Sequence, residues 1–417
     1  MLSQVNFKSK LPKKLQKYAS RGVIPKLFLA PFAILILFGF LLAKPFVQFR
    51  LYRMVDSRIG HLAGNTEMVR LGTMLRNQTN KKREIIVYCS ESWNCANNAL
   101  RKLFFRDSLH IRGHLAWLTL RLSLKLIPFR SFKTVPNRNL IIDRTGLLLI
   151  NTPLLEFANQ DLIIGQKFLD EAQVIDSKFV CLNVRDSEYL TNQLGYQVHK
   201  HDYRDSDIKT YVAAAEALAE MGYTVFRMGA IVKEPLISKH PRVINYATNG
   251  MRTEFLDIFL GAHCAFAVST GSGWDEVPQI FRRPVSYFNL LPLVSHSFLS
   301  RSITFFPKIL LDCDSSEVLT LQQLFERGAA TPLNTQAYKD SGVVIRDLSS
   351  EELVDAVTEM AQRVEGTFVE TPEQKEMQAK AKHILSTHPK LQPSPNYYPI
   401  RAQFASCFLS RYPNFLD

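Results

Sequence analysis

The chain has 417 residues, a formal net charge of +13 and 46% hydrophobic residues. This length allows two domains, and the ordinary composition excludes a wholly disordered chain. The charge is unevenly distributed, because residues 1–140 hold 25 Lys/Arg and 5 Asp/Glu whereas residues 141–417 hold 26 and 33. A basic first part predicts a surface that meets anions such as phospholipid headgroups or nucleic acid. The six cysteines follow no metal or disulfide spacing, so we expect thiols in a reducing compartment.

The first element is an apolar run, Leu27–Ala43, which carries no charge and has basic residues on both sides. As a helix this run would measure about 25 Å, somewhat less than a hydrocarbon core of about 30 Å. A spanning helix stays open, as does a buried core helix. A re-entrant or monotopic hairpin, bent near Pro31, fits the two basic flanks better. We therefore assign residues 1–54 to a basic N-terminus with a membrane-associated helix.

A second basic stretch, Ala99–Lys133, contains a single acidic residue, Asp107. Within it Leu118–Leu126 alternates apolar and polar residues, yet the run is long and rich in leucine, so helix and strand both remain open. The stretch is typical of a surface that lies on anionic lipid, or of an ordinary solvated face. No DNA- or RNA-binding motif accompanies it, so we expect no nucleic-acid partner.

The rest of the chain alternates strand and helix patterns, which predicts an α/β fold with parallel sheets. For the first domain, residues 55–175, we predict a strand at Met54–Ile59, a helix at Met68–Leu75 and a strand at Ile85–Tyr88. Leu140–Ile142 and Leu147–Ile150 also resemble strands.

For the second domain, residues 176–365, we predict strands at Phe179–Arg185, Thr224–Arg227, Val243–Ile244, Ala265–Val268, Val285–Phe288, Ile309–Leu311 and Val343–Ile345. Helices are expected from Asp205 or Ser206 to Met221, at Thr253–Leu260, from the 269–273 loop to Phe281, at Leu319–Arg327 and at Glu351–Arg363. Ser349 and Glu352 predict a capping box at the start of the last of these helices. Residues 366–417 are expected to be a largely helical tail that packs across both domains.

One loop has the composition of a phosphate site. It is Ser269-Thr270-Gly271-Ser272-Gly273, placed between a predicted buried strand and a helix start. Such a loop can offer backbone N–H groups, hydroxyl donors and the positive end of a helix dipole to an anion. Arg185, Arg227 and Lys233 follow other strands of the same predicted sheet, at the edge where ligands bind. Together these groups predict a diphosphate site.

Several segments also resemble a known group of proteins. They are Arg58–Glu67, Val184–Ser187, His201–Asp207, Phe226–Gly229, Ser269–Glu276 and Phe408–Pro413. Across residues 55–417 they resemble a little-characterised bacterial family of glycosyltransferases linked to surface-polysaccharide loci. More distantly, Asn183-Val184-Arg185-Asp186 is similar to a strand end of GT-B fucosyltransferases, in which the arginine holds the donor diphosphate.

The resemblance implies a GT-B-like fold with two Rossmann-like domains facing a cleft, the acceptor in the first domain and the nucleotide-sugar donor in the second. It implies Glu276 as a further donor ligand, no cofactor and no bound metal. Asp205-Ser206-Asp207 has the spacing of an Asp-x-Asp metal motif, but it lies at a predicted helix start, so we interpret it as a helix cap.

A base for the acceptor hydroxyl is expected from the first domain, with His61 and Glu67 as candidates and Asn65 as an acceptor-binding residue. The implied activity is sugar transfer to a lipid-linked saccharide or surface glycan at the cytoplasmic face of the bacterial inner membrane. Another group transferase on glycans, such as a pyruvyl transferase, and a non-catalytic glycan-binding or scaffold protein remain alternatives.

Overall fold

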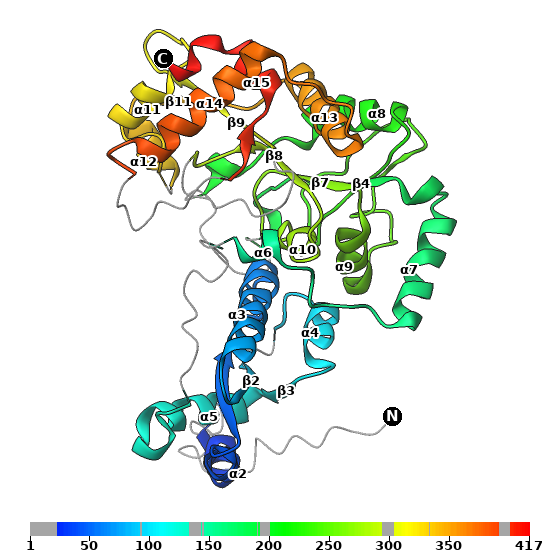
Figure 1. Cartoon of the computed structure of the whole chain (residues 1–417). Helices are drawn as coiled ribbons and strands as arrows, with labels where there is room; N and C mark the ends of the chain where they lie inside the picture. Colours follow the sequence, from blue (N-terminus) through cyan, green and yellow to red (C-terminus); the bar gives the residue numbers. More distant parts are fainter. Residues whose placement is uncertain are drawn as a thin grey trace, which may run out of the picture. The chain divides into compact units, whose positions relative to one another are not determined.

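The computed structural model describes residues 23–91, 94–132, 143, 146–189, 191, 201–293, 304–332, 334–391 and 401–417. The chain divides into unit 1, Met1–Leu140, and unit 2, Ile141–Asp417 (Figure 1). Both units are α/β, and most of their strands pair in parallel, as predicted. Each of the six cysteines is a thiol. In the part of the chain that the structure describes, no helix has both the length and the apolar character needed to cross a bilayer.

Unit 1 contains a three-stranded parallel sheet in the order β1-β2-β3. Its strands are β1 (Val47–Arg53), β2 (Arg83–Ser90) and β3 (Leu109–Arg112). The predicted strand at Met54–Ile59 is wrong, because the chain leaves the sheet after Arg53. The earlier residues form the strand instead, since Phe49 and Leu51 alternate with Gln48 and Arg50 and place their apolar side chains in the core.

The helices of unit 1 are α2 (Val23–Ala43), η2 (His61–Asn65, a π-helix), α3 (Thr66–Thr79), α4 (Asn98–Phe105), α5 (Gly113–Lys125) and η3 (Ile127–Phe129). The alternating leucines of Leu118–Leu126 therefore lie mostly on a helix rather than on a strand. Leu37 of α2 and Leu120 of α5 share a core with Leu51 and Val87 of the sheet. Helix α2 is thus part of the folded unit and packs along α5.

Unit 2 is built on a seven-stranded parallel sheet in the order β12-β9-β8-β7-β4-β5-β6. The strands are β4 (Phe179–Asn183), β5 (Thr224–Arg227), β6 (Val243–Ile244), β7 (Phe266–Ser269), β8 (Val285–Leu290), β9 (Thr304–Pro307) and β12 (Gln403–Phe404). The central strands are buried along their whole length, which explains their continuous apolar runs. β10 (Ile309–Asp312) and β11 (Val343–Arg346) form a separate antiparallel pair.

Unit 2 also contains a set of helices, some of which cover the two faces of this sheet. They are α6 (Leu147–Ile150), α7 (Asn159–Glu171), η4 (Ile175–Ser177), η7 (Asp202–Arg204), η8 (Ile208–Tyr211), α8 (Val212–Glu220), α9 (Glu254–His263), α10 (Glu276–Ile280), α11 (Leu321–Glu326), α12 (Thr335–Asp340), α13 (Ser350–Glu365), α14 (Pro372–Thr387), α15 (Ser406–Arg411) and η9 (Pro413–Leu416). Figure 1 shows α8 and α13 on one side of the sheet and α7, α9 and α10 on the other.

Two expectations near the start of unit 2 change. Leu147–Ile150 is a helical turn rather than a strand, because Gly146 turns the chain in a left-handed conformation and Asp143 Oδ2 accepts a hydrogen bond from Leu148 N. Residues 159–171, which fall within the range that we gave the first domain, form helix α7, and Phe168 of this helix packs into the core of unit 2. The other predicted strand at this junction, Leu140–Ile142, lies outside the described residues.

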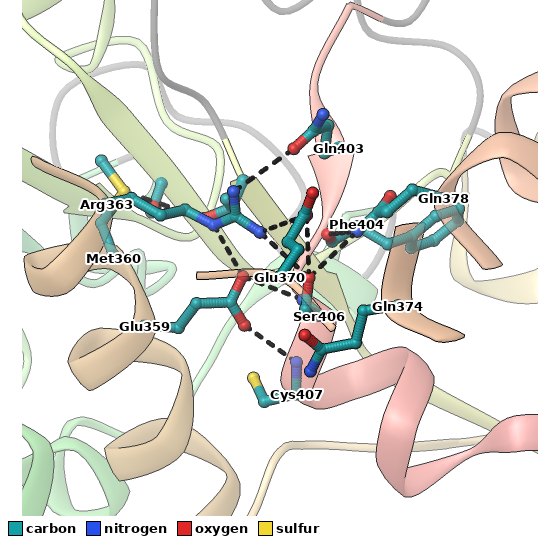
Figure 2. Close-up of polar contacts among 12 residues, drawn as sticks. Glu359, Met360, Arg363, Glu370, Gln374, Gln378, Gln403, Phe404, Ser406 and Cys407 are labelled. Carbon is teal, nitrogen blue, oxygen red and sulfur yellow. Dashed lines mark hydrogen bonds and ion pairs between the residues drawn. The ribbon is translucent and has the colours of Figure 1, made fainter. Parts of the chain in front are cut away.

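The C-terminal segment completes unit 2. β12 pairs with β9 at the sheet edge, and Glu359 of α13 accepts hydrogen bonds from Ser406 N at 2.9 Å and Cys407 N at 2.8 Å (Figure 2). Arg363, one turn further along α13, donates to Glu359 and to Glu370. This network joins α15 and β12 to α13. The predicted capping box of Ser349 and Glu352 at the start of α13 is confirmed.

Candidate functional site

Three neighbouring strands of unit 2 end side by side, and this edge carries the predicted site residues. β4 lies between β5 and β7, and the register pairs Leu182 with Arg227 and Asn183 with Ser269. Because the strands are parallel, the segments that follow them emerge at the same edge, where ligands bind in open α/β sheets. The topology therefore places the Arg185 segment between Arg227 and the 269–273 loop.

The 269–273 loop holds its own conformation through internal hydrogen bonds. Ser269 Oγ donates to Asp275 Oδ2 at 3.0 Å, and the same carboxylate oxygen accepts from Ser272 N at 2.9 Å. Gly271 N donates to Ser269 Oγ at 3.1 Å. Ser269 and Asp275 are both buried. These internal hydrogen bonds fix the conformation of the loop.

These bonds change how the loop can hold an anion. We expected free amides there, but those of Thr270, Gly271, Ser272 and Trp274 already have acceptors in the protein. The helix that follows, α10, has five residues, so its dipole is small. Cationic side chains, rather than amides, are the groups at this edge best able to balance a diphosphate.

Arg185 is hydrogen-bonded directly to the loop. Its backbone N donates to Thr270 Oγ1 at 2.9 Å, and its guanidinium donates to His201 O at 3.0 Å and forms an ion pair with Asp205. Two residues earlier, Asn183 Nδ2 donates to Ser272 Oγ at 2.5 Å. The end of β4 and the loop after β7 therefore form one connected polar surface.

Arg204 was not among the residues that we selected from the sequence, yet it lies at this surface. Its Nη2 donates to Gly271 O, while its Nε is buried and has no acceptor. Burial lowers the pKa of Arg185, and the nearby positive charge of Arg204 lowers it further. Two guanidinium groups are thus close enough for their charges to interact, which favours an anion between or beside them.

Arg227 is also at this edge, but it is deeply buried, with 1% of its surface exposed. Its Nη1 donates to Met228 O, its Nη2 lies 3.9 Å from Asp186 Oδ2, and its buried Nε has no acceptor. Burial lowers its pKa to about 10, so it remains charged at neutral pH. Lys233 lies nearby with an exposed side chain, and its backbone N donates to Asp186 Oδ2 at 2.9 Å.

Lys308, between β9 and β10, is a second cation that we did not select. It is buried, and its Nζ donates to Asp205 O at 2.5 Å and to Asp347 Oδ1 at 2.6 Å. The isolated lysine between two apolar strands was the sequence signal that could have indicated it. Because Asp205 also pairs with Arg185, Lys308 supports the position of that arginine.

Two carboxyl groups follow the loop. Burial raises the pKa of Asp275 to about 6, and hydrogen bonds from Ser269 and Ser272 oppose the shift. Burial raises the pKa of Glu276 well above its ordinary value, and the charge of Asp275 adds to the effect. Glu276 Oε2 is buried without a hydrogen-bond partner. Glu276 is therefore positioned beside the loop, but its carboxylate is disfavoured there.

The candidate residues of unit 1 surround the π-helix η2, a feature that is frequent at functional sites. His61 is half-buried, and its Nδ1 lies 3.3 Å from Asn65 Nδ2. Burial lowers the pKa of His61, and the charge of Arg58 lowers it further, so the neutral imidazole is favoured over the imidazolium. Asn65 and Glu67 have no exposed surface. His61 is therefore the more accessible of the two candidate bases.

Among the described residues, no three His, Cys, Asp or Glu side chains converge in a way that could hold a metal ion.

No family model matches the chain, and no curated protein matches it. Solved structures do show similarity. A glycosyl transferase of family 9 from Veillonella parvula has 11% sequence identity and a TM-score of 0.43, with 75% of this chain and 97% of that chain covered. The ADP-heptose LPS heptosyltransferase II of E. coli has 13% identity and a TM-score of 0.39, with 62% of this chain and 90% of that chain covered.

Proposed function

We propose that the chain is a glycosyltransferase of the GT-B type, which binds a nucleotide-sugar donor in unit 2 and transfers the sugar to a lipid-linked saccharide or surface glycan. The observation that carries the proposal is the arginine cluster Arg185, Arg204 and Arg227 at one edge of the parallel sheet. Two members of the cluster have a buried Nε with no acceptor. We propose that the donor diphosphate binds against this cluster.

The energetics of a buried guanidinium support an anionic ligand. A buried donor without an acceptor costs free energy, and the cost is greater when the group is charged. The phosphate oxygens of a diphosphate would accept from such donors in charge-assisted hydrogen bonds. The same cations would stabilise the diphosphate as it leaves the sugar, which is the electrostatic task of a transferase site.

His61 is our proposed base for the acceptor hydroxyl. A neutral imidazole with a lowered pKa can accept a proton at neutral pH. For this role His61 Nδ1–H donates to Asn65 Oδ1, and Nε2 accepts the proton of the acceptor hydroxyl. This hydrogen bond requires the side-chain amide of Asn65 to be flipped, because Nδ2 faces His61 Nδ1 in the structure. Asn65 then positions His61, and Glu67 remains buried.

Calorimetric titration with UDP, GDP, CDP and dTDP tests the donor site. We expect one of the four to bind the wild-type chain, and Arg204→Ala or Arg185→Ala to weaken that binding by roughly 10-fold or more, as expected for the loss of a hydrogen bond to a charged group. The control is Arg242→Ala. Arg242 precedes β6, and its carbonyl accepts from Val225 N near the start of β5, so it lies at the opposite edge of the same sheet.

The titration can also refute the proposal. If none of the four diphosphates binds, the arginine cluster is not a donor site, and a non-catalytic glycan-binding role becomes the better explanation. If one binds but the cluster variants and Arg242→Ala all behave as wild type, the diphosphate binds elsewhere.

A further inference from the structure

From Phe28 to Ala43 helix α2 is apolar on all sides, but only one of its sides is covered by unit 1. Ala33 and Leu37 have no exposed surface. Phe40 stacks on Phe49 of β1 with ring centroids 4.3 Å apart and meets Phe132 edge-on at 6.0 Å. This inner side belongs to the core of unit 1 and is not available to another partner.

The outer side of α2 is an exposed apolar stripe. Its residues, with their exposed fractions, are Phe28 (75%), Phe32 (58%), Leu35 (66%), Phe38 (49%), Leu42 (64%) and, just beyond the helix, Phe46 (80%). Their spacing of three or four residues places them along one face of the helix. A continuous apolar surface of this kind marks a contact with a protein or a membrane. We call these six residues the outer stripe.

Basic side chains lie at the end of the outer stripe. Lys82 Nζ donates to Lys44 O at 3.2 Å, so the turn that carries Lys81, Lys82 and Arg83 lies at the C-terminal end of α2. All three of these basic residues are exposed. The neighbouring carboxylate of Glu84 is buried and paired with two arginines, so it does not offset their charge at the surface.

The C-terminal end of α5, the helix packed against α2, has the same character. Leu124 and Leu126 are exposed, and they are interspersed with the exposed basic residues Arg121, Lys125 and Arg130. Exposed apolar side chains with cations beside them are the pattern of a surface that lies in the interface of an anionic bilayer.

We infer that the outer stripe docks on an anionic lipid surface, with α2 parallel to the membrane plane. The stripe enters the boundary between headgroups and acyl chains, and the 81–83 turn meets lipid phosphates. An apolar face on this kind of helix is buried about 5–10 Å deep. The inference is independent of the proposed function, because none of these residues belongs to the donor site.

The charges also argue for lipid over a second copy of the chain. In a two-fold dimer the same patch lies on both sides of the interface. Unit 1 carries 25 Lys/Arg against 5 Asp/Glu, so pairing two such patches would bring like charges together. An anionic headgroup layer supplies the opposite charge instead.

Co-sedimentation of the full chain with vesicles tests the inference. We expect binding to phosphatidylglycerol-containing vesicles that is weakened by salt, and little binding to phosphatidylcholine alone. Phe32→Glu/Leu35→Glu should reduce binding more than 10-fold, and each of Lys81→Gln and Lys82→Gln should reduce it roughly fivefold. The matched control is Ile237→Glu/Val369→Glu, since these apolar residues of unit 2 are 77% and 82% exposed.

Three results would overturn the inference. One is vesicle binding by Phe32→Glu/Leu35→Glu equal to that of the wild type. Another is a dimer, seen by light scattering, that this variant converts to a monomer. The third is wild-type protein that stays with the membrane in alkaline carbonate, since a spanning helix resists that extraction.

Circular dichroism checks that Phe32→Glu/Leu35→Glu is folded. If this double variant is unfolded, the single substitution Phe46→Glu, which lies beyond the helix, takes its place in the vesicle assay. The nucleotide titration should be unchanged in all variants, which separates this test from that of the donor site.

Discussion

Replacing Glu352 with Gln should remove a measurable part of the stability of unit 2 at neutral pH. Glu352 is buried at the start of α13, and its carboxylate accepts from Arg346 Nη1 and Nη2, each at 3.0 Å, and from Tyr412 O–H. Burial alone would raise its pKa. Hydrogen bonds from Arg346, Tyr412 and Ser349 N outweigh burial and lower the pKa to about 2.

The magnitude follows from the shift. A fall from the ordinary value of 4.5 to about 2 corresponds to roughly 3 kcal/mol in favour of the folded state. Because the side chain of Arg346 is 38% exposed, solvent weakens the pair and we expect about 2 kcal/mol. The folded-state pKa is depressed, so this contribution is present above pH 4.5 and is lost as the pH falls from 4.5 to 2.

Glutamine is a suitable replacement, because it keeps the capping box at this position while removing the charge. Urea unfolding at pH 7 should show the variant less stable by about 2 kcal/mol, and the difference from wild type should disappear near pH 2. The control is Glu351→Gln, on the same helix with a side chain 77% exposed, where we expect less than about 0.5 kcal/mol. A loss in Glu352→Gln that is equally large at pH 7 and pH 2 would refute the electrostatic explanation.

Three further predictions concern the loop, the C-terminal segment and the base. Gly271 has φ +81, and a Cβ there would lie 2.9 Å from Leu290 Cδ1. Gly271→Ala should therefore lower the free energy of unfolding by about 2 kcal/mol, seen by thermal shift, and weaken nucleotide binding, seen by calorimetry. Glu359→Ala leaves Ser406 N and Cys407 N without their acceptor and removes one of the two carboxylates paired with Arg363. It should cost about 3 kcal/mol, with faster proteolysis of residues 401–417 than in wild type. His61→Ala should lower the rate of sugar transfer about 100-fold while leaving nucleotide affinity unchanged; a matching loss of affinity would contradict its role as the base.

The central strands of unit 2 could be predicted because their signals are local. Thr224–Arg227 is recovered with its bounds, since a glycine ends the helix before it and every residue of the strand is buried. The capping box at Ser349 is equally local. β12 could not be predicted, because two residues pair with β9 about a hundred positions away in the chain and carry no periodicity of their own.

In the candidate site, too, the features with local sequence signals could be predicted and those that depend on distant contacts could not. Arg185 and Thr270 could be paired from the sequence, because parallel strands bring their ends to one edge. Arg204 lies in the short helix η7, whose position depends on tertiary contacts, so no sequence pattern indicated it. Lys308 was signalled only by its place as a single lysine between two apolar strands. The acceptors for the loop amides were also hidden. The amide of Ser272, for example, is bound by Asp275, which folds back onto the loop.

Unit 2 belongs to an acidic part of the chain, yet Arg185, Arg204 and Arg227 lie at one edge of its sheet. Neighbouring carboxylates reduce the repulsion between these positive charges. Asp205 pairs with Arg185, and Asp186 lies 3.9 Å from Arg227. Burial raises the pKa of Asp205, which shows that its charge is costly where it stands. The arginines at this edge are therefore not isolated cations. When a diphosphate binds, they would replace their contacts with poorly solvated carboxylates by contacts with phosphate oxygens. Net affinity would then depend on the Nε donors of Arg204 and Arg227, which those carboxylates leave without a hydrogen bond.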